Sequence, residues 1–185
     1  MKTFDESAAA AARARQSQLT KPPGSLGRLE ELAVFMAGWQ GRERPRIDHA
    51  QALVFAGNHG VTQQGVNSFP PEVTAQMVAN FERGGAAINQ LCRIAGADLR
   101  IVALDLERPT ADFTRGMALE VPDLVASIQT GKDAVDPGAD VILLGEMGIG
   151  NSTVAAALSA ATFGGTAADW VGPGAGADDA TMANK

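Results

Sequence analysis

Residues 141–153 read VILLGEMGIGNST, and this stretch decides how the rest of the chain is interpreted. Its aliphatic residues predict a short buried strand over 140–144, and the glycines that follow predict a tight turn. The polar residues 151–153 then predict the first turn of an alanine-rich helix that continues to Thr162. A strand that leads through a glycine turn into a helix is the repeating unit of α/β proteins, whose ligands bind beyond the carboxyl ends of the strands.

The same alternation of strands and helices extends over most of the chain. Further strands are predicted at 50–56 (AQALVFA), at 99–104 (LRIVAL) and, as the start of a fourth, at 168–171. Helices are predicted between them at 70–83, at 88–95 and at 122–129, where Gly131 is expected to end the helix. Strands joined by helices predict an α/β fold with a mostly parallel sheet and helices on both faces.

The first 48 residues have a different pattern, without strands. Residues 7–18 predict one helix, and Ser25 is expected to cap a second after the sequence KPPG at 21–24. The sequence therefore divides into a helical segment, 1–48, and an α/β segment, 49–185. Because a capping pattern stands only a few residues before the last residue, a truncated chain is expected.

Composition excludes several classes of function. The chain has 185 residues, 15 Lys and Arg against 21 Asp and Glu, a net charge of −6 and a pI near 4.9. This acidic balance argues against nucleic acid or an anionic membrane as the main partner. One cysteine and two histidines argue against a disulfide framework and a metal site. A signal-peptide pattern and a long apolar stretch are both absent from the sequence, so a soluble, cytoplasmic protein is expected.

The glycine turn at 145–150 is the strongest candidate site. A helix N-terminus presents unpaired N–H groups and a positive dipole end to a phosphate, and Asn151, Ser152 and Thr153 add polar side chains. The alternative is an ordinary strand-to-helix turn with a polar cap. Glu146, at the end of the strand, could act as a base or orient a substrate group. The alternative for Glu146 is a solvated loop carboxylate.

A second glycine-rich turn, GPGAG at 172–176, precedes the lysine at position 185. Gly174 and Gly176 would let the backbone approach a phosphate closely, and Lys185 would supply a point charge. The alternative is a flexible tail with an exposed lysine.

Two further groups of residues lie in loops or at a helix start. His59, between asparagine and glycine, lies where catalytic groups gather, although a structural ring hydrogen bond is the simpler explanation. Ser68, Phe69, Gln76 and Met77 mix apolar and amide groups on one side of the helix and its preceding loop. That mixture suits a flat heteroaromatic ring, and core packing is the alternative.

Six motifs occur in the order found in a known family. They are KPPGSLGRLE at 21–30, GNHGV at 57–61, PPEVT at 70–74, GGAAIN at 84–89, GEMGIGNST at 145–153, and VGPGAG at 171–176 with Lys185. Together, along essentially the whole chain, they resemble the nicotinate-nucleotide–dimethylbenzimidazole phosphoribosyltransferases, which make the lower-ligand nucleotide of cobalamin. The motifs are modest singly and specific as a set.

The resemblance implies a reaction, a fold and an assembly. Phosphoribose moves from nicotinate mononucleotide to 5,6-dimethylbenzimidazole, giving α-ribazole 5′-phosphate and nicotinate with inversion at the anomeric carbon. No metal or organic cofactor is implied. The implied fold is a Rossmann-like α/β domain with a small helical domain, to which residues 1–48 would belong. The implied assembly is a homodimer in which the small domain of one subunit helps to close the active site of the other.

The resemblance also implies roles for individual residues. Phosphate and nucleotide binding falls to seven positions: Gly148, Asn151, Ser152, Thr153, Gly174, Gly176 and Lys185. Base binding falls to Ser68, Phe69, Gln76 and Met77. Glu146 would lie near the reacting centre and orient the base. Pro173 and Ala175 stand where many members have arginine and threonine, so the shape of the second turn is left open.

The general base of the family has no counterpart in this chain. In the family it is a glutamate far downstream of the matched lysine, and we do not assign its role to Glu146. We therefore expect these 185 residues by themselves to be inactive or nearly so. Two alternatives stand beside the enzyme: a nucleotide-binding module without transfer chemistry, and a structural fragment stabilised by self-association.

Overall fold

The computed structural model describes residues 3–185 and separates them after Asp48 into two compact units. That the first unit belongs to a small domain stays a prediction. None of the helices in residues 3–185 is long and apolar enough to cross a membrane.

The first unit consists of two helices, α1 (Glu6–Gln16) and α2 (Arg28–Gln40). The Asp5 side chain caps α1 by accepting a hydrogen bond from the Ala8 amide at 3.0 Å. The predicted cap of α2 at Ser25 is wrong, because consecutive turns continue to Gly27, whose φ of +52° interrupts the helical backbone. The carboxylate of Glu30 orders this segment by accepting from Lys21 Nζ at 2.6 Å.

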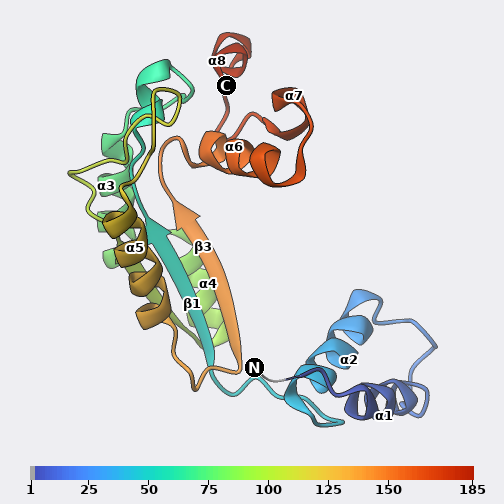
Figure 1. Cartoon of the computed structure of the whole chain (residues 1–185). Coiled ribbons are helices and arrows are strands. Elements are labelled where there is room, and N and C mark those ends of the chain that lie inside the picture. Colours follow the sequence, from blue (N-terminus) through green and yellow to red (C-terminus); the bar gives the residue numbers. More distant parts are fainter. Residues whose placement is uncertain (1–2) are drawn as a thin grey trace. The chain divides into compact units, whose positions relative to one another are not determined.

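The second unit contains a parallel sheet of three strands, β1 (Ala50–Ala56), β2 (Ala97–Ala103) and β3 (Val141–Met147). The strand order is β2-β1-β3, so β1 is the central strand. The three predicted strands are thereby confirmed, with boundaries shifted by no more than three residues. Because all three strands run parallel, their carboxyl ends lie at the same end of the sheet, and Figure 1 shows this for β1 and β3.

Helices cover both faces of the sheet, as predicted. Val54 on β1 packs with Phe81 and Ala86, which belong to α3 (Glu72–Glu82) and to the residue before α4 (Ala87–Ala95). Gln51, three residues earlier and therefore on the opposite face, donates through Nε2 to the carbonyl of Ala134 at 3.0 Å. Ala134 ends α5 (Val121–Ala134), which lies on the other side of the sheet from α4 in Figure 1.

The remaining elements come after the carboxyl ends of the strands. The 3-10 helix η1 (Gly60–Gln64) follows β1, and the helices α6 (Asn151–Phe163), α7 (Ala167–Trp170) and α8 (Asp179–Asn184) follow β3. The predicted end of a helix at Gly131 is wrong, since α5 continues through this glycine.

The predicted fourth strand at 168–171 is also wrong. The amide and hydroxyl of Thr166 donate to the Asp169 carboxylate at 2.7 and 2.9 Å, and this capping box closes the helical turn of α7. Trp170 Nε1 donates to the Gly164 carbonyl at 2.8 Å and holds the turn. Local side-chain hydrogen bonds thus override the apolar run that indicated a strand.

Candidate functional site

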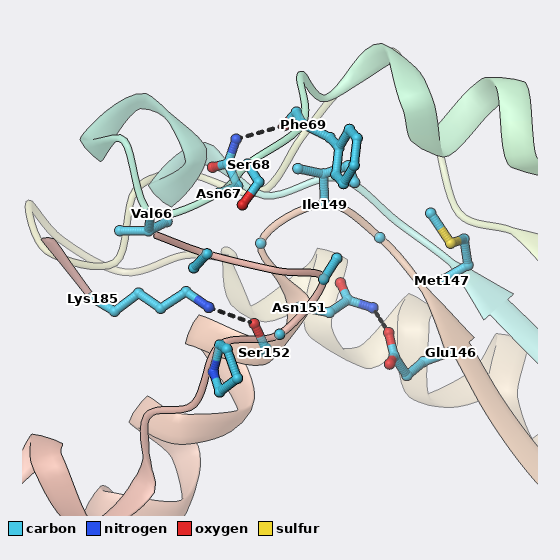
Figure 2. Close-up of a pocket in the computed structure, with 16 residues that line it drawn as sticks. Val66, Asn67, Ser68, Phe69, Glu146, Met147, Ile149, Asn151, Ser152 and Lys185 are labelled. Atoms are coloured by element: carbon cyan, nitrogen blue, oxygen red, sulfur yellow. Dashed lines mark hydrogen bonds between the residues drawn. The ribbon is translucent and has the colours of Figure 1, made fainter. Parts of the chain in front are cut away.

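A cavity of about 250 Å³ lies beyond the carboxyl end of β3 (Figure 2). The lining comes from the loop before α3, the turn from β3 into α6, the glycine-rich segment before α8, and Lys185, which follows α8. The polar, charged and aromatic residues of its lining include Ser68, Phe69, Glu146, Asn151, Ser152 and Lys185. The site therefore occupies the place where open α/β sheets bind ligands.

The turn between β3 and α6 is held tightly by its neighbours. A Cβ atom at Gly148 would lie 2.3 Å from both the Gly57 carbonyl oxygen and Asn151 Oδ1, so only glycine fits this position. The amide of Ile149 donates to Thr74 Oγ1 at 3.1 Å, and Thr74 is fully buried on α3. Gly150 follows with a φ of +94°. The close approach of these backbones fixes the direction in which α6 begins.

The N-terminus of α6 faces the cavity through Asn151 and Ser152. Gly150 caps this helix without a side-chain hydrogen bond, and the amides of Asn151 and Thr153 donate to the backbone carbonyls of Gly148 and Gly150. The positive end of the helix dipole stabilises an anion at this position. The geometry suits the phosphate predicted from the sequence.

Lys185 joins the two glycine turns. Its Nζ donates to Ser152 Oγ at 3.2 Å and to the Gly172 carbonyl at 2.9 Å. Gly174, with a φ of +53°, lies between them: a Cβ atom there would be 2.8 Å from Ser152 Oγ and 3.1 Å from Lys185 Nζ. The lysine therefore places its positive charge beside the α6 N-terminus, the positive end of the helix dipole.

Glu146 lines the same cavity and is hydrogen-bonded to Asn151. Asn151 Nδ2 donates to Glu146 Oε2, and the other end of this amide, Oδ1, contacts Nε2 of His59. Figure 2 shows the Glu146 carboxylate and the Lys185 ammonium at different ends of the lining. A ligand with an anionic end and a hydrogen-bond donor further along would match both groups.

The predicted phosphate-binding residues differ in their position relative to the cavity. Gly148, Asn151, Ser152, Gly174 and Lys185 line it, whereas Gly176 and Thr153 do not. Thr153 is only 4% exposed, and its hydroxyl is buried without a hydrogen-bond partner among residues 3–185. The roles assigned to all seven residues stay predictions.

Only two of the four predicted base-binding residues line the cavity. Ser68 and Phe69 line the cavity, and Asn67 Nδ2 donates to the Phe69 carbonyl at 2.7 Å (Figure 2). Gln76 is exposed outside the cavity lining, and Met77 packs against the core cluster around Val54. In this structure only the loop half of the predicted base site faces the cavity.

Several lining residues escaped the sequence analysis. Val66, Asn67 and Ile149 contribute to the wall, and Ala177 closes the glycine-rich side. Their proximity to Ser68, Gly148 and Gly176 in the sequence was the available signal. Among the described residues 3–185, no group of three or more His, Cys, Asp and Glu side chains could hold a metal ion.

A parallel α/β sheet with a helix N-terminus and a lysine side chain at the carboxyl ends of its strands has the architecture in which open α/β proteins bind phosphorylated ligands. A family model described as "Phosphoribosyltransferase" matches residues 1–185. The chain belongs to this phosphoribosyltransferase family.

Curated relatives and solved structures agree with this assignment. The chain is 65% identical over 181 residues to the nicotinate-nucleotide–dimethylbenzimidazole phosphoribosyltransferase of Rhodobacter capsulatus, covering 98% of this chain and 54% of that protein. It is 61% identical to the enzyme of the same name from Ruegeria pomeroyi, with the same coverage. The crystal structure of CobT from Thermus thermophilus superposes with a TM-score of 0.87 at 37% identity, covering 96% of this chain and 59% of that one. The chain thus spans about half the length of the curated relatives that it matches.

Proposed function

We propose that this chain binds nicotinate mononucleotide and 5,6-dimethylbenzimidazole and belongs to a phosphoribosyltransferase that makes α-ribazole 5′-phosphate for the lower ligand of cobalamin. The observation that carries the proposal is the convergence of Lys185 and Ser152 at the α6 N-terminus, in one cavity with Glu146 and Phe69. The names of the relatives support the two substrates.

In the proposed reaction the phosphate of the mononucleotide lies at the α6 N-terminus, beside the Lys185 ammonium. A ring nitrogen of the benzimidazole attacks the anomeric carbon while the bond to nicotinate breaks. Nicotinate leaves with the bonding electrons, and the second ring nitrogen of the base gives its proton to the downstream glutamate of the family, which has no counterpart among these 185 residues. Phe69 offers an apolar surface to the base, and Glu146 accepts a hydrogen bond that orients the nucleotide.

Lys185 provides the most direct test of nucleotide binding. We expect Lys185→Ala to weaken nicotinate mononucleotide binding about tenfold or more, the loss of one charge-assisted hydrogen bond. The matched control is Lys132→Ala, which removes the same charge from the exposed last turn of α5. Calorimetric titration measures both variants. Equal affinity of Lys185→Ala and the unmodified chain would contradict the proposed phosphate site.

Binding of the base separates the transferase from a nucleotide-binding module. A transferase site binds dimethylbenzimidazole as well as the mononucleotide, whereas a module without transfer chemistry retains the mononucleotide alone. We expect Phe69→Ala to weaken dimethylbenzimidazole binding and to leave the mononucleotide unaffected. Phe163→Ala, at an exposed phenylalanine outside the cavity, is the control.

We propose that these 185 residues by themselves release little or no α-ribazole phosphate, because the chain has no residue matching the downstream glutamate of the family. Product release is measured by chromatography with both substrates present, and robust turnover would refute this. The homodimer and the cytoplasmic location stay predictions. Sedimentation velocity with and without the mononucleotide tests the homodimer, and ligand-independent aggregation would favour the structural-fragment alternative.

A further inference from the structure

One hydrogen-bonded chain of side chains crosses the carboxyl edge of the sheet behind the cavity. Thr110 lies in the segment after β2, His59 in the loop after β1, and Asn151 and Glu146 flank the turn after β3. Thr110 Oγ1 lies 3.5 Å from His59 Nδ1, His59 Nε2 contacts Asn151 Oδ1, and Asn151 Nδ2 contacts Glu146 Oε2. Glu146 and Asn151 line the cavity, whereas His59 does not. Any effect of His59 on a ligand therefore passes through Asn151.

Because the Glu146 carboxylate can only accept hydrogen bonds, it sets the direction of every hydrogen bond between these four side chains. The Glu146 carboxylate only accepts, so the Asn151 amide must turn its NH2 group toward Glu146 and its oxygen toward His59. That oxygen also only accepts, so His59 Nε2 carries a proton. In the neutral ring Nδ1 is then an acceptor, and the Thr110 hydroxyl is placed to donate to it. A flipped Asn151 amide would set its oxygen against the carboxylate.

The backbone around His59 is held firmly on both sides. The Gly60 amide donates to the Thr110 carbonyl at 2.8 Å, and the Thr110 amide donates to the Asn58 carbonyl at 3.1 Å. A Cβ atom at Gly60 would lie 2.6 Å from the Thr110 carbonyl oxygen, so the two segments approach as closely as glycine allows. Thr62 Oγ1 donates to the His59 carbonyl at 2.8 Å. The imidazole is thus presented to Asn151 from a rigid support.

We propose that His59, as its Nε2–H tautomer, is a positioning residue that orients Asn151 and thereby aims the Glu146 carboxylate at a hydroxyl donor of the bound nucleotide. Oε2 of Glu146 is occupied by Asn151, and Oε1 has no protein partner among residues 3–185 and remains for the ligand. This inference rests on the proposed function. It gives a role to His59, which does not line the cavity and acts on the ligand only through Asn151.

The first test compares two probes that share a phosphate. Nicotinate mononucleotide reaches both Lys185 and Glu146, whereas inorganic phosphate reaches only the Lys185 end. We expect His59→Ala to weaken nicotinate mononucleotide binding about tenfold, the loss of one hydrogen bond to a charged group, and to weaken inorganic phosphate binding less, because phosphate does not reach Glu146. His59→Gln, whose amide NH2 can also donate to Asn151 Oδ1, should recover most of the affinity. Equal loss for both probes, or no loss for the mononucleotide, would overturn the proposal.

The second test reads the histidine itself and needs no ligand. The chain has two histidines, so ring nitrogen NMR of the protein and of His49→Ala assigns the His59 signals. We expect the Nε2–H tautomer at neutral pH and a shift of the Asn151 side-chain amide signals in His59→Ala. An Nδ1–H tautomer would refute the arrangement. If the unmodified chain binds neither probe, the proposed function fails, and these signals still decide whether His59 orients Asn151.

Discussion

The strands β1 and β3 have similarly apolar sequences, AQALVFA and VILLGEM, yet their environments differ sharply. Leu53 and Leu144 are partners in the parallel register, and their side chains are 1% and 77% exposed. β1 has a strand on each side, α3 and α4 against one face and α5 near the other, whereas β3 pairs with β1 alone among residues 3–185. An apolar run therefore predicts a strand, and the neighbours of the strand decide its burial.

At the carboxyl ends of the two strands the order is reversed, because the turn after β3 is more tightly packed than the turn after β1. Gly57, directly after β1, has open space where a Cβ atom would stand, whereas Gly148, after β3, has none. The exposed strand thus ends in the tighter turn, and that turn lines the cavity. Stability is concentrated along β1, and the geometry of the site is concentrated at the end of β3.

The largest expected effect is that of shortening the buried leucine. Leu53→Ala should lower the free energy of unfolding by about 2–5 kcal/mol, because it leaves a cavity in the sheet core. Its register partner is the control, and Leu144→Ala should change stability by no more than about 0.5 kcal/mol. Urea denaturation followed by circular dichroism measures both. Comparable losses would show that the β3 face is covered in solution and would break the comparison.

Exchanging amide and apolar side chains sharpens the same contrast. The buried amide of Gln51 donates to the Ala134 carbonyl at 3.0 Å and accepts from the Asp136 amide at 2.9 Å. Gln51→Leu should cost about 1–3 kcal/mol, since it leaves both backbone groups without this partner. The reverse exchange on β3, Leu144→Gln, should cost no more than about 0.5 kcal/mol. If Gln51→Leu left the free energy of unfolding unchanged in the same denaturation assay, the two assigned hydrogen bonds would be contradicted.

Alanine substitutions of the glycines after β1 and β3 test whether the turn after β3 is the more tightly packed of the two. Gly148→Ala should destabilise the chain by about 1–3 kcal/mol, because the new methyl group meets the Gly57 carbonyl oxygen. Gly57→Ala should be tolerated, with a change within about 1 kcal/mol. Thermal denaturation of the two variants provides the measurement. Tolerance of alanine at Gly148 would mean that the turn is looser than its contacts indicate.

The smallest expected effect is one of pH on the loop after β1. Asp112 accepts a hydrogen bond from the Gln64 side chain at 2.6 Å, and this bond, with those from Thr114, lowers the pKa of Asp112. A lowered pKa means that the ionised carboxylate stabilises the folded loop above the ordinary carboxyl pKa, and that this stabilisation is lost as the pH falls through the folded pKa. Acid should therefore lower the protection of the η1 amides against exchange, after correction for the intrinsic pH dependence of exchange, before it affects the Ile149 amide in the turn after β3, which donates to the uncharged hydroxyl of Thr74.

Asp112→Asn is the matched variant for this prediction. It keeps the shape of the side chain and removes the titrating carboxyl group. The difference in amide exchange between η1 and the turn after β3 should then no longer depend on this group. Hydrogen exchange at pH 5 and at pH 3 is the comparison, and an unchanged pH dependence in Asp112→Asn would assign the effect to another group.

Sequence reasoning identified much of the candidate site but not its geometry. The glycine turns, Ser152 and Lys185 stand out because their residue types suit a phosphate, and they line one cavity. Gln76 and Met77 share a helix, but helical spacing does not say which side of that helix meets the cavity. Met77 instead packs against the core beside Val54.

The amino-acid sequence by itself determined the three strands, the glycine turns and the family. These follow from local periodicity, from backbone positions that favour glycine, and from motifs in a specific order. Only the tertiary structure decided that β1 is buried while β3 is exposed, that 168–171 form part of a helical turn, and that His59 meets Asn151 across 92 positions of sequence. Those outcomes depend on which distant groups pack together, and that information is absent from any short stretch of the chain.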